Sequence, residues 1–372
     1  MKVILAGSAT GGHIYPAIAI ADKIKRKNPD AEILFISAKK ELGSTIVSDN
    51  GYRSRHINIQ GLNRRNMLKN ISVVKDYAVS GHQVRKILKQ FNPDIVIGTG
   101  GYVSAPVLKE AKRKGIPAFL HEQNVVSGLS NKMAQKYVDK IFVAFEEGKS
   151  QFKDPDKVVV TGNPIRKGFI TSGAIDYRKR LGVDDKDFAI LIFGGSNGAE
   201  RINAVTVELL KKISDEKDVN VFFITGRRQY WDVLEELKQS GVYDNRRFHI
   251  IEYTEVIHEF FAASDLIVGR SGALTVSEIT ACGKPSILIP SPNVTGNHQY
   301  YNAKPLEDAG ASIIIDESDL TGDSLYSKIM ALKNNREKIN EMAEASSKMG
   351  RLDSVDIIYR ELESYNNGER QG

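Results

Sequence analysis

The chain has 372 residues, of which 41% are hydrophobic and 26% charged, as in a soluble globular protein. No apolar run approaches the roughly 18 residues of a membrane span, and the N-terminus begins with a strand pattern instead of a signal peptide. The single cysteine, Cys282, excludes an internal disulfide. We therefore predict a cytoplasmic protein that is long enough for two domains of roughly 150 to 200 residues.

Strand-like runs alternate with helical patterns from end to end, which is typical of parallel α/β sheets. In the first half the predicted strands are residues 2–6, 32–36, 54–57, 94–98, 118–121, 140–144 and 157–161. In the second half they are residues 188–193, 219–225, 248–251, 265–268, 285–289 and 312–315, and two helical segments, 320–345 and 353–366, end the chain. The pattern restarts after Gly162-Asn163-Pro164, so we place domains at 1–163 and 164–350 and a C-terminal helix at 351–372.

The net charge of +6 is unevenly distributed along the chain. Residues 1–162 contain 26 Lys and Arg against 14 Asp and Glu. The excess is greatest between residues 53 and 89, where Asp76 is the only acid among many bases. Such a segment suits nucleic acid, an anionic membrane surface or only solvent.

Two glycine-rich loops, at residues 7–13 and 194–199, each follow a hydrophobic strand and open a helix. A strand that feeds such a loop brings backbone N–H groups and a helix N-terminus to one point, which suits a phosphate. Two such loops indicate two Rossmann-like halves that face a shared cleft. His13, at the end of the first loop, is a candidate base, and a packed or helix-capping histidine is the alternative.

Further polar motifs follow other predicted strands. Gly98–Pro106 is a second glycine loop of the first half, and His121-Glu122-Gln123-Asn124 stands at the carboxyl end of a buried strand, where ligands bind in open α/β sheets. In the second half, a helix that begins near Gly272 suits a diphosphate, and Glu278 within it suits a ribose diol. An internal ion pair is the alternative partner for Glu278.

Taken together, the motifs resemble the MurG-type family of transferases over essentially the whole chain. They are Thr10–His13, Gly100–Ser104, His121–Asn124, Gly162–Arg166, Gly194–Ser196, Arg270–Glu278 and His298–Ala303. The chain has Ser8-Ala9 and Ala105 where the family usually has glycines. The resemblance implies a GT-B fold, which is two Rossmann-like parallel-sheet domains facing a cleft, and transfer of N-acetylglucosamine from UDP-GlcNAc to undecaprenyl-diphosphate-MurNAc-pentapeptide.

The resemblance also implies roles for particular residues. His13 is the expected base of an inverting displacement by the acceptor 4-hydroxyl, with Glu122 as the alternative. The expected donor-side residues are Thr10, Gly11, Gly12, Asn124, Arg166, Ser196, Asn203, Ile251, Gly272, Ala273, Leu274, Thr275, Glu278 and Gln299. The expected acceptor-side residues are Thr10, Gly101, Tyr102 and Ser104. No Asp-x-Asp pair ends a strand of the donor half, so we expect no metal and no other cofactor.

The basic segment at 53–90 then predicts peripheral association with the anionic cytoplasmic face of the cell membrane, and no nucleic-acid partner. A UDP-GlcNAc 2-epimerase or a glycolipid transferase on the same fold is the nearest alternative enzyme. An NAD-dependent oxidoreductase is a further alternative, but the first loop lacks the Gly-x-Gly-x-x-Gly order.

Overall fold

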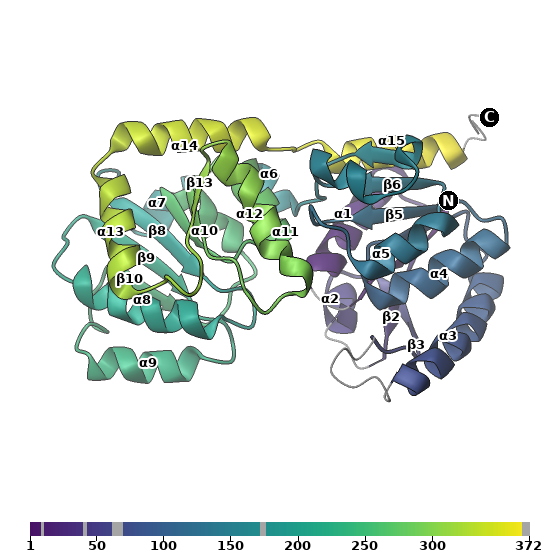
Figure 1. The fold of residues 1–372 in the computed structure, drawn as a ribbon, viewed down its shortest axis with the longest axis horizontal. Helices are drawn as coiled ribbons and strands as arrows, with labels where there is room; N and C mark the ends of the chain where they lie inside the picture. Colours follow the sequence, from purple (N-terminus) through teal and green to yellow (C-terminus); the bar gives the residue numbers. More distant parts are fainter. Residues whose placement is uncertain (9–10, 40–42, 62–69, 172–175, 367–372) are drawn as a thin grey trace. The chain divides into compact units, whose positions relative to one another are not determined.

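The computed structural model describes residues 1–8, 11–39, 43–61, 70–171 and 176–366 (Figure 1). The chain divides into two compact units. Unit 1 comprises Met1–Arg166 and Arg351–Gly372, and unit 2 comprises Lys167–Gly350. Thr10, which we expected to contact both substrates, lies outside the described residues. Within the described part of the chain, no helix is both long enough and apolar enough to cross a bilayer.

Unit 1 is built on a parallel sheet of seven strands in the order β3-β2-β1-β4-β5-β6-β7. The strands are β1 (Lys2–Ala6), β2 (Glu32–Ala38), β3 (Arg53–Ile57), β4 (Ile95–Gly98), β5 (Ala118–Glu122), β6 (Lys140–Val143) and β7 (Val158–Val160). The central strands are apolar along almost their whole length because helices cover both faces of the sheet.

The helices of unit 1 form two layers (Figure 1). One core cluster packs α1 (Gly11–Lys27), α2 (Gly43–Asp49) and α15 (Ser354–Asn366) against one face, and the other packs α3 (Asn70–Phe91), α4 (Gly101–Arg113) and α5 (Leu129–Ala134) against the opposite face. The C-terminal helix α15 lies against α1, where Ile358 and Leu362 are fully buried. Its Tyr359 hydroxyl accepts a hydrogen bond of 2.8 Å from Asn28.

Unit 2 has a parallel sheet of six strands in the order β10-β9-β8-β11-β12-β13. Its strands are β8 (Phe188–Phe193), β9 (Val219–Ile224), β10 (Phe248–Ile251), β11 (Leu266–Gly269), β12 (Ser286–Leu288) and β13 (Ser312–Ile314). Its helices are α6 (Lys167–Thr171), α7 (Tyr177–Arg180), α8 (Glu200–Lys212), α9 (Tyr230–Gln239), α10 (Ile257–Ala263), α11 (Ala273–Ala281), α12 (His298–Asp308), α13 (Gly322–Lys333) and α14 (Arg336–Met349).

In both sheets the strand order reverses beside the first strand, between β1 and β4 and between β8 and β11. Ligands of doubly wound sheets bind outside the carboxyl ends of the strands at such a reversal. Every predicted strand is present, with bounds that differ by no more than two residues. The predicted helix at 320–345 is instead two helices, because the Asn335 side chain accepts from the Lys338 N–H at 2.9 Å and starts α14 there.

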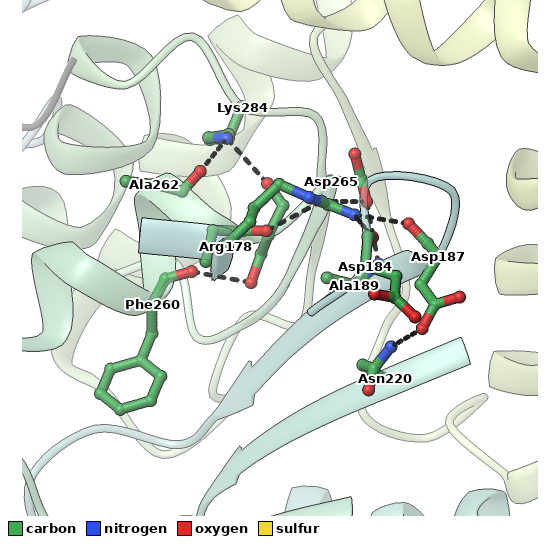
Figure 2. Close-up of polar contacts among 11 residues, drawn as sticks. Arg178, Asp184, Asp187, Ala189, Asn220, Phe260, Ala262, Asp265 and Lys284 are labelled. Carbon is green, nitrogen blue, oxygen red and sulfur yellow. Dashed lines mark hydrogen bonds and ion pairs between the residues drawn. The ribbon is translucent and has the colours of Figure 1, made fainter. Parts of the chain in front are cut away.

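At the opposite, amino-terminal edge of the unit 2 sheet, Arg178 joins α7 to two other chain segments, residues 184–187 and 263–265 (Figure 2). Its guanidinium donates to the Ala263 carbonyl, to the Asp265 carboxylate at 2.9 Å, and to the carbonyls of Asp184 and Asp187. Nearby, Lys284 donates to the carbonyls of Ala262 and Ser264, and burial lowers the pKa of Lys284. This edge is therefore structural.

We expect Arg178→Ala to lower the free energy of unfolding of unit 2 by about 3 kcal/mol, because it leaves the carboxylate of Asp265 largely buried without its cation. Differential scanning calorimetry measures the effect. Lys179→Ala removes an exposed side chain from the same short helix and should change stability by less than about 0.5 kcal/mol. Equal effects of the two substitutions would contradict this assignment.

Candidate active site

His13 and the polar motif after β5 meet at the carboxyl edge of the unit 1 sheet. His13 lies in the first turn of α1, directly after the loop that follows β1, and Gln123 directly follows β5. The Nδ1 atom of His13 lies 2.9 Å from Oε1 of Gln123. The β1, β4 and β5 strands are neighbours in the sheet, so their carboxyl ends bring these two side chains together.

Behind Gln123 the hydrogen bonds continue into the protein. The side-chain nitrogen of Gln123 lies 2.8 Å from the Thr99 carbonyl and 2.9 Å from Nδ1 of His121. Nε2 of His121 lies 3.2 Å from the Gly162 carbonyl. Both His121 and Gln123 are buried, and burial lowers the pKa of His121 to about 4, so this ring is neutral at neutral pH.

Gly100, at the turn from β4 into α4, allows the His13 ring to lie close to the backbone. It has φ +105°, and a Cβ atom there would lie 2.8 Å from Nδ1 of His13. Only glycine adopts this positive φ without strain and leaves room for the His13 ring. The glycine loop of residues 98–101 therefore shapes the space that His13 occupies.

The predicted acceptor-side residues of this loop differ in what they can contact. Ser104 is fully buried, and its hydroxyl lies 2.8 Å from the carbonyls of both Ala6 and Gly100, which share its single proton, while it accepts from the Gly100 N–H. Its side chain holds the loop against β1, and its expected acceptor-side role remains a prediction. Tyr102 is half-buried against the core, and Gly101 lies over the buried Ser8, whose side chain fits beneath it.

Glu122 is a buried hydrogen-bond acceptor. Its carboxylate accepts bonds from the backbone N–H groups of Asn124 and Gly128 at 3.0 Å, and from side chains of the same loop. These side chains are Asn124, Ser127 and Asn131. With both oxygens saturated by donors and only 1% exposure, Glu122 organises residues 122–131. This geometry disfavours it as the base.

Other predicted residues of unit 1 surround the start of α1. Gly12 is exposed, and Gly11 is partly exposed beside the ring of Tyr15. The Arg166 guanidinium lies 4.9 Å from the centre of that ring, so a positive charge is held near the first turn of α1.

In unit 2, the loop after β8 requires glycine for its shape. Gly195 and Gly198 have φ +97° and +81°, and a Cβ on Gly194 would lie 2.5 Å from the Ala199 nitrogen. The loop leaves Ser196 exposed at its tip. Asn203, in contrast, is buried and donates to the Thr225 carbonyl at 2.8 Å and to the Gln229 side chain, so it supports the loop from behind.

Helix α11 starts at the carboxyl end of β11, as expected. Gly272 is its N-cap, with no side-chain cap, followed by Ala273, Leu274 and Thr275 in the first turn. The side chain of Glu278, one turn further along, is only 7% exposed. The first-turn N–H groups and the helix dipole favour an anion at this point.

Ile251 is the last residue of β10, and Gln299 lies in the helix that follows β12 in the chain. Gln299 is in the first turn of α12, and its side-chain oxygen accepts from the Ser291 N–H at 2.9 Å, which directs its NH₂ group away from that loop. The Ile251 carbonyl accepts from the Thr225 N–H at 3.0 Å and is thus part of the pairing at the end of β9 and β10. Among the described residues, no cluster of three metal-ligating side chains occurs.

Two doubly wound parallel sheets, each with a glycine loop and helix N-terminus at its ligand-binding edge, define the GT-B class of glycosyltransferase folds. Residues 3–143 match the model of the glycosyltransferase family 28 N-terminal domain, and residues 189–357 match that of the family 28 C-terminal domain. The chain belongs to glycosyltransferase family 28.

Relatives along the full length narrow the assignment. The chain is 43% identical to a protein of Thermoanaerobacter sp. (strain X514), over 98% of this chain and 100% of the relative. It is 41% identical to a protein of Clostridioides difficile (strain 630), over 97% of this chain and 88% of the relative. Both relatives are named UDP-N-acetylglucosamine--N-acetylmuramyl-(pentapeptide) pyrophosphoryl-undecaprenol N-acetylglucosamine transferase. The resemblance to the MurG family is thereby confirmed.

Solved structures agree on the fold. Acinetobacter baumannii MurG superposes with a TM-score of 0.76 at 24% identity, covering 98% of this chain and 99% of that one. A Neisseria meningitidis UDP-GlcNAc 2-epimerase bound to UDP-GlcNAc superposes with a TM-score of 0.71 at 16% identity, covering 98% and 100%. Because transferases and epimerases share this fold, the superposition alone does not separate the two activities.

The sequence motifs did not single out Gln123 or Gly100. Gln123 lies within the motif 121–124, but nothing in the spacing indicates which of its polar residues contacts His13. The glycines of residues 98–101 all read as turn formers, and the structure distinguishes Gly100 because it is the one that approaches the His13 ring.

Proposed function

We propose that this chain is an inverting hexosyltransferase of peptidoglycan synthesis. It moves N-acetylglucosamine from UDP-GlcNAc to the MurNAc 4-hydroxyl of undecaprenyl-diphosphate-MurNAc-pentapeptide, forming a β-1,4 linkage and converting lipid I to lipid II. The observation that carries this proposal is the identity of 43% along the full length to transferases whose name states these substrates.

The chemistry is a direct displacement at the anomeric carbon. The acceptor oxygen forms a bond to that carbon as the bond to the UDP oxygen breaks, and the hydroxyl proton passes to a base. His13 is the proposed base, because it stands at the ligand-binding edge of the unit 1 sheet, whereas Glu122 is saturated with hydrogen bonds. The departing diphosphate takes the electron pair and needs positive potential around it.

The donor-side residues supply that potential and the binding contacts. We assign the diphosphate to Ser196 and to the first turn of α11 at residues 272–275. Arg166, in unit 1, remains an expected donor residue. Glu278 is assigned to the ribose diol and Gln299, through its NH₂ group, to the sugar hydroxyls. Ile251, Asn124 and Asn203 remain expected neighbours of the donor, with Asn203 acting through the loop that it supports.

Acceptor-dependent transfer tests the proposal directly. Purified protein is incubated with radiolabelled UDP-GlcNAc, with and without a water-soluble lipid I analogue. We expect labelled disaccharide only with the acceptor, and the same yield in EDTA because no metal or other cofactor is expected. Conversion of UDP-GlcNAc to its 2-epimer without acceptor would identify an epimerase instead.

The acceptor is lipid-linked, so unit 1 should contact a membrane surface. The described part of the basic segment 53–90 exposes Arg53, Arg55, Arg85, Lys86 and Lys89. On the α3–α5 face of unit 1, Leu129 and Met133 of α5 are 54% and 58% exposed, and α3 exposes Val79. Basic and apolar side chains exposed together suit an anionic leaflet. We propose peripheral association with the cytoplasmic face of the membrane.

We expect the double substitution Lys86→Ala/Lys89→Ala to weaken binding to phosphatidylglycerol vesicles by about 2 kcal/mol, or roughly 30-fold, at low salt. Co-sedimentation measures the binding. Lys211→Ala/Lys217→Ala changes the net charge equally but on exposed positions of unit 2, and it should bind like the unmodified protein. An equal loss in both variants would indicate non-specific charge attraction, and no binding by the unmodified protein would refute membrane association.

A further inference from the structure

We propose that Gln123 and His121 are positioning residues that hold His13 as the neutral tautomer with its proton on Nδ1, so that Nε2 is the atom that takes the acceptor's proton. This inference rests on the proposed function, in which His13 is the base. The inference extends the proposed function by naming Nε2 as the reacting nitrogen of His13 and Gln123 and His121 as the residues that determine its protonation state.

Two backbone carbonyls determine the direction of every hydrogen bond in the network. A carbonyl oxygen only accepts, so the group facing it must donate. The Gly162 carbonyl therefore requires a proton on Nε2 of His121, at 3.2 Å. The Thr99 carbonyl, 2.8 Å away, requires the NH₂ group of Gln123 on its side of the amide.

The orientation of Gln123 then propagates to His13. His121 is neutral and carries its proton on Nε2, so its Nδ1 is an acceptor for the second hydrogen of the Gln123 NH₂ group, at 2.9 Å, with the His121 carbonyl as a longer acceptor at 3.3 Å. Gln123 thus turns its oxygen toward His13. Since that oxygen only accepts, Nδ1 of His13 must donate across the 2.9 Å contact.

The opposite arrangement is unfavourable at each step. A flipped Gln123 amide would place two oxygens 2.8 Å apart at Thr99 and would leave Nδ1 of His121 without a donor. The Gly162 carbonyl is itself held in place, because it also accepts from the hydroxyls of Thr161 and Ser354, each at 2.9 Å. With Nδ1 protonated, the lone pair of neutral His13 is on Nε2.

Nitrogen NMR on the full chain with ¹⁵N-labelled histidine tests the tautomer itself. The chain has 7 histidines, and the His13 signals are assigned as those lost in His13→Asn. At a pH where His13 is neutral, we expect Nδ1 to show the shift of a protonated nitrogen and Nε2 that of an unprotonated one. The reverse pattern, or an even mixture, would overturn the proposal.

Kinetics on Gln123→Met test the consequence. Methionine is similar in length but neither donates nor accepts strongly, so His13 should become a mixture of tautomers in the NMR spectrum. We expect kcat to fall about 10- to 100-fold, less than the roughly 10²–10⁴-fold contribution of the general base itself, with KM for UDP-GlcNAc unchanged. Ser80→Ala removes a buried hydrogen bond elsewhere in unit 1, from the Ser80 hydroxyl to the Tyr77 carbonyl, and should retain both kcat and the His13 signals.

The outcomes separate this inference from the proposed function. If Gln123→Met keeps its kcat, or leaves the His13 signals unchanged, Gln123 is not a positioning residue even though transfer stands. If the unmodified chain forms no disaccharide, the proposed function fails, while the NMR experiment still decides the tautomer. If Gln123→Met does not fold, the spectrum of the unmodified chain decides it.

Discussion

His13→Ala is expected to reduce kcat for transfer to the lipid I analogue by about 10²–10⁴-fold, the contribution typical of a general base. The acceptor hydroxyl would then have to lose its proton to water while it attacks the anomeric carbon. Binding of UDP-GlcNAc should change little, because the donor contacts proposed in unit 2 are untouched. Single-turnover kinetics, with KM for UDP-GlcNAc as the second readout, measure the effect.

The fold should tolerate this substitution. His13 is only partly buried in the first turn of α1, and alanine is a good helix former. Lys25→Ala, at an exposed position of the same helix, is the matched control and should leave kcat unchanged. Near-normal turnover of His13→Ala would rule out His13 as the base.

Glu122→Ala is expected to act on stability first. The substitution removes the acceptor of five donors, three of them on Asn131, Ser127 and Gly128, and these groups have no water to replace it at a site that is 1% exposed. Leaving several buried donors unsatisfied should lower the free energy of unfolding of unit 1 by about 3 kcal/mol or more. Calorimetry of the unit 1 transition measures it.

Comparison with the substitution of a second carboxylate separates a structural role of Glu122 from a catalytic one. Glu146→Ala, at an exposed ion pair with Lys149 in the same unit, should change stability by less than about 1 kcal/mol. If Glu122→Ala kept its melting temperature and lost only kcat, Glu122 would be the base after all.

The strands were predictable because they are almost continuous apolar runs between glycine and polar turns, as in β8 at Phe188–Phe193. The break between α13 and α14 was not predictable from the sequence. It depends on the single side-chain cap of Asn335, within a stretch whose apolar periodicity continues on both sides. Helix capping by a side chain competes with apolar periodicity at such positions, and the hydrophobic pattern of the sequence shows only the periodicity.

The candidate site was predictable in its location but not in its roles. Glycine loops and polar residues after β1, β4 and β5 mark the ligand-binding edge of a parallel sheet. Glu122 and Gln123 are adjacent in the chain, yet successive side chains leave the end of a strand in different directions. One therefore enters a buried donor cluster and the other contacts His13.

The sequence by itself determined the fold class and the family, because both depend on the order of motifs and on the period of apolar residues along the chain. It also identified His13 and the 121–124 motif as candidate site residues. Only the tertiary structure decided which hydrogen-bond donor faces which acceptor in the candidate site. The carbonyls of Thr99 and Gly162 orient Gln123 and His121, and these contacts join residues up to 41 positions apart. Hydrogen-bond direction is a property of three-dimensional neighbours, which no local pattern specifies.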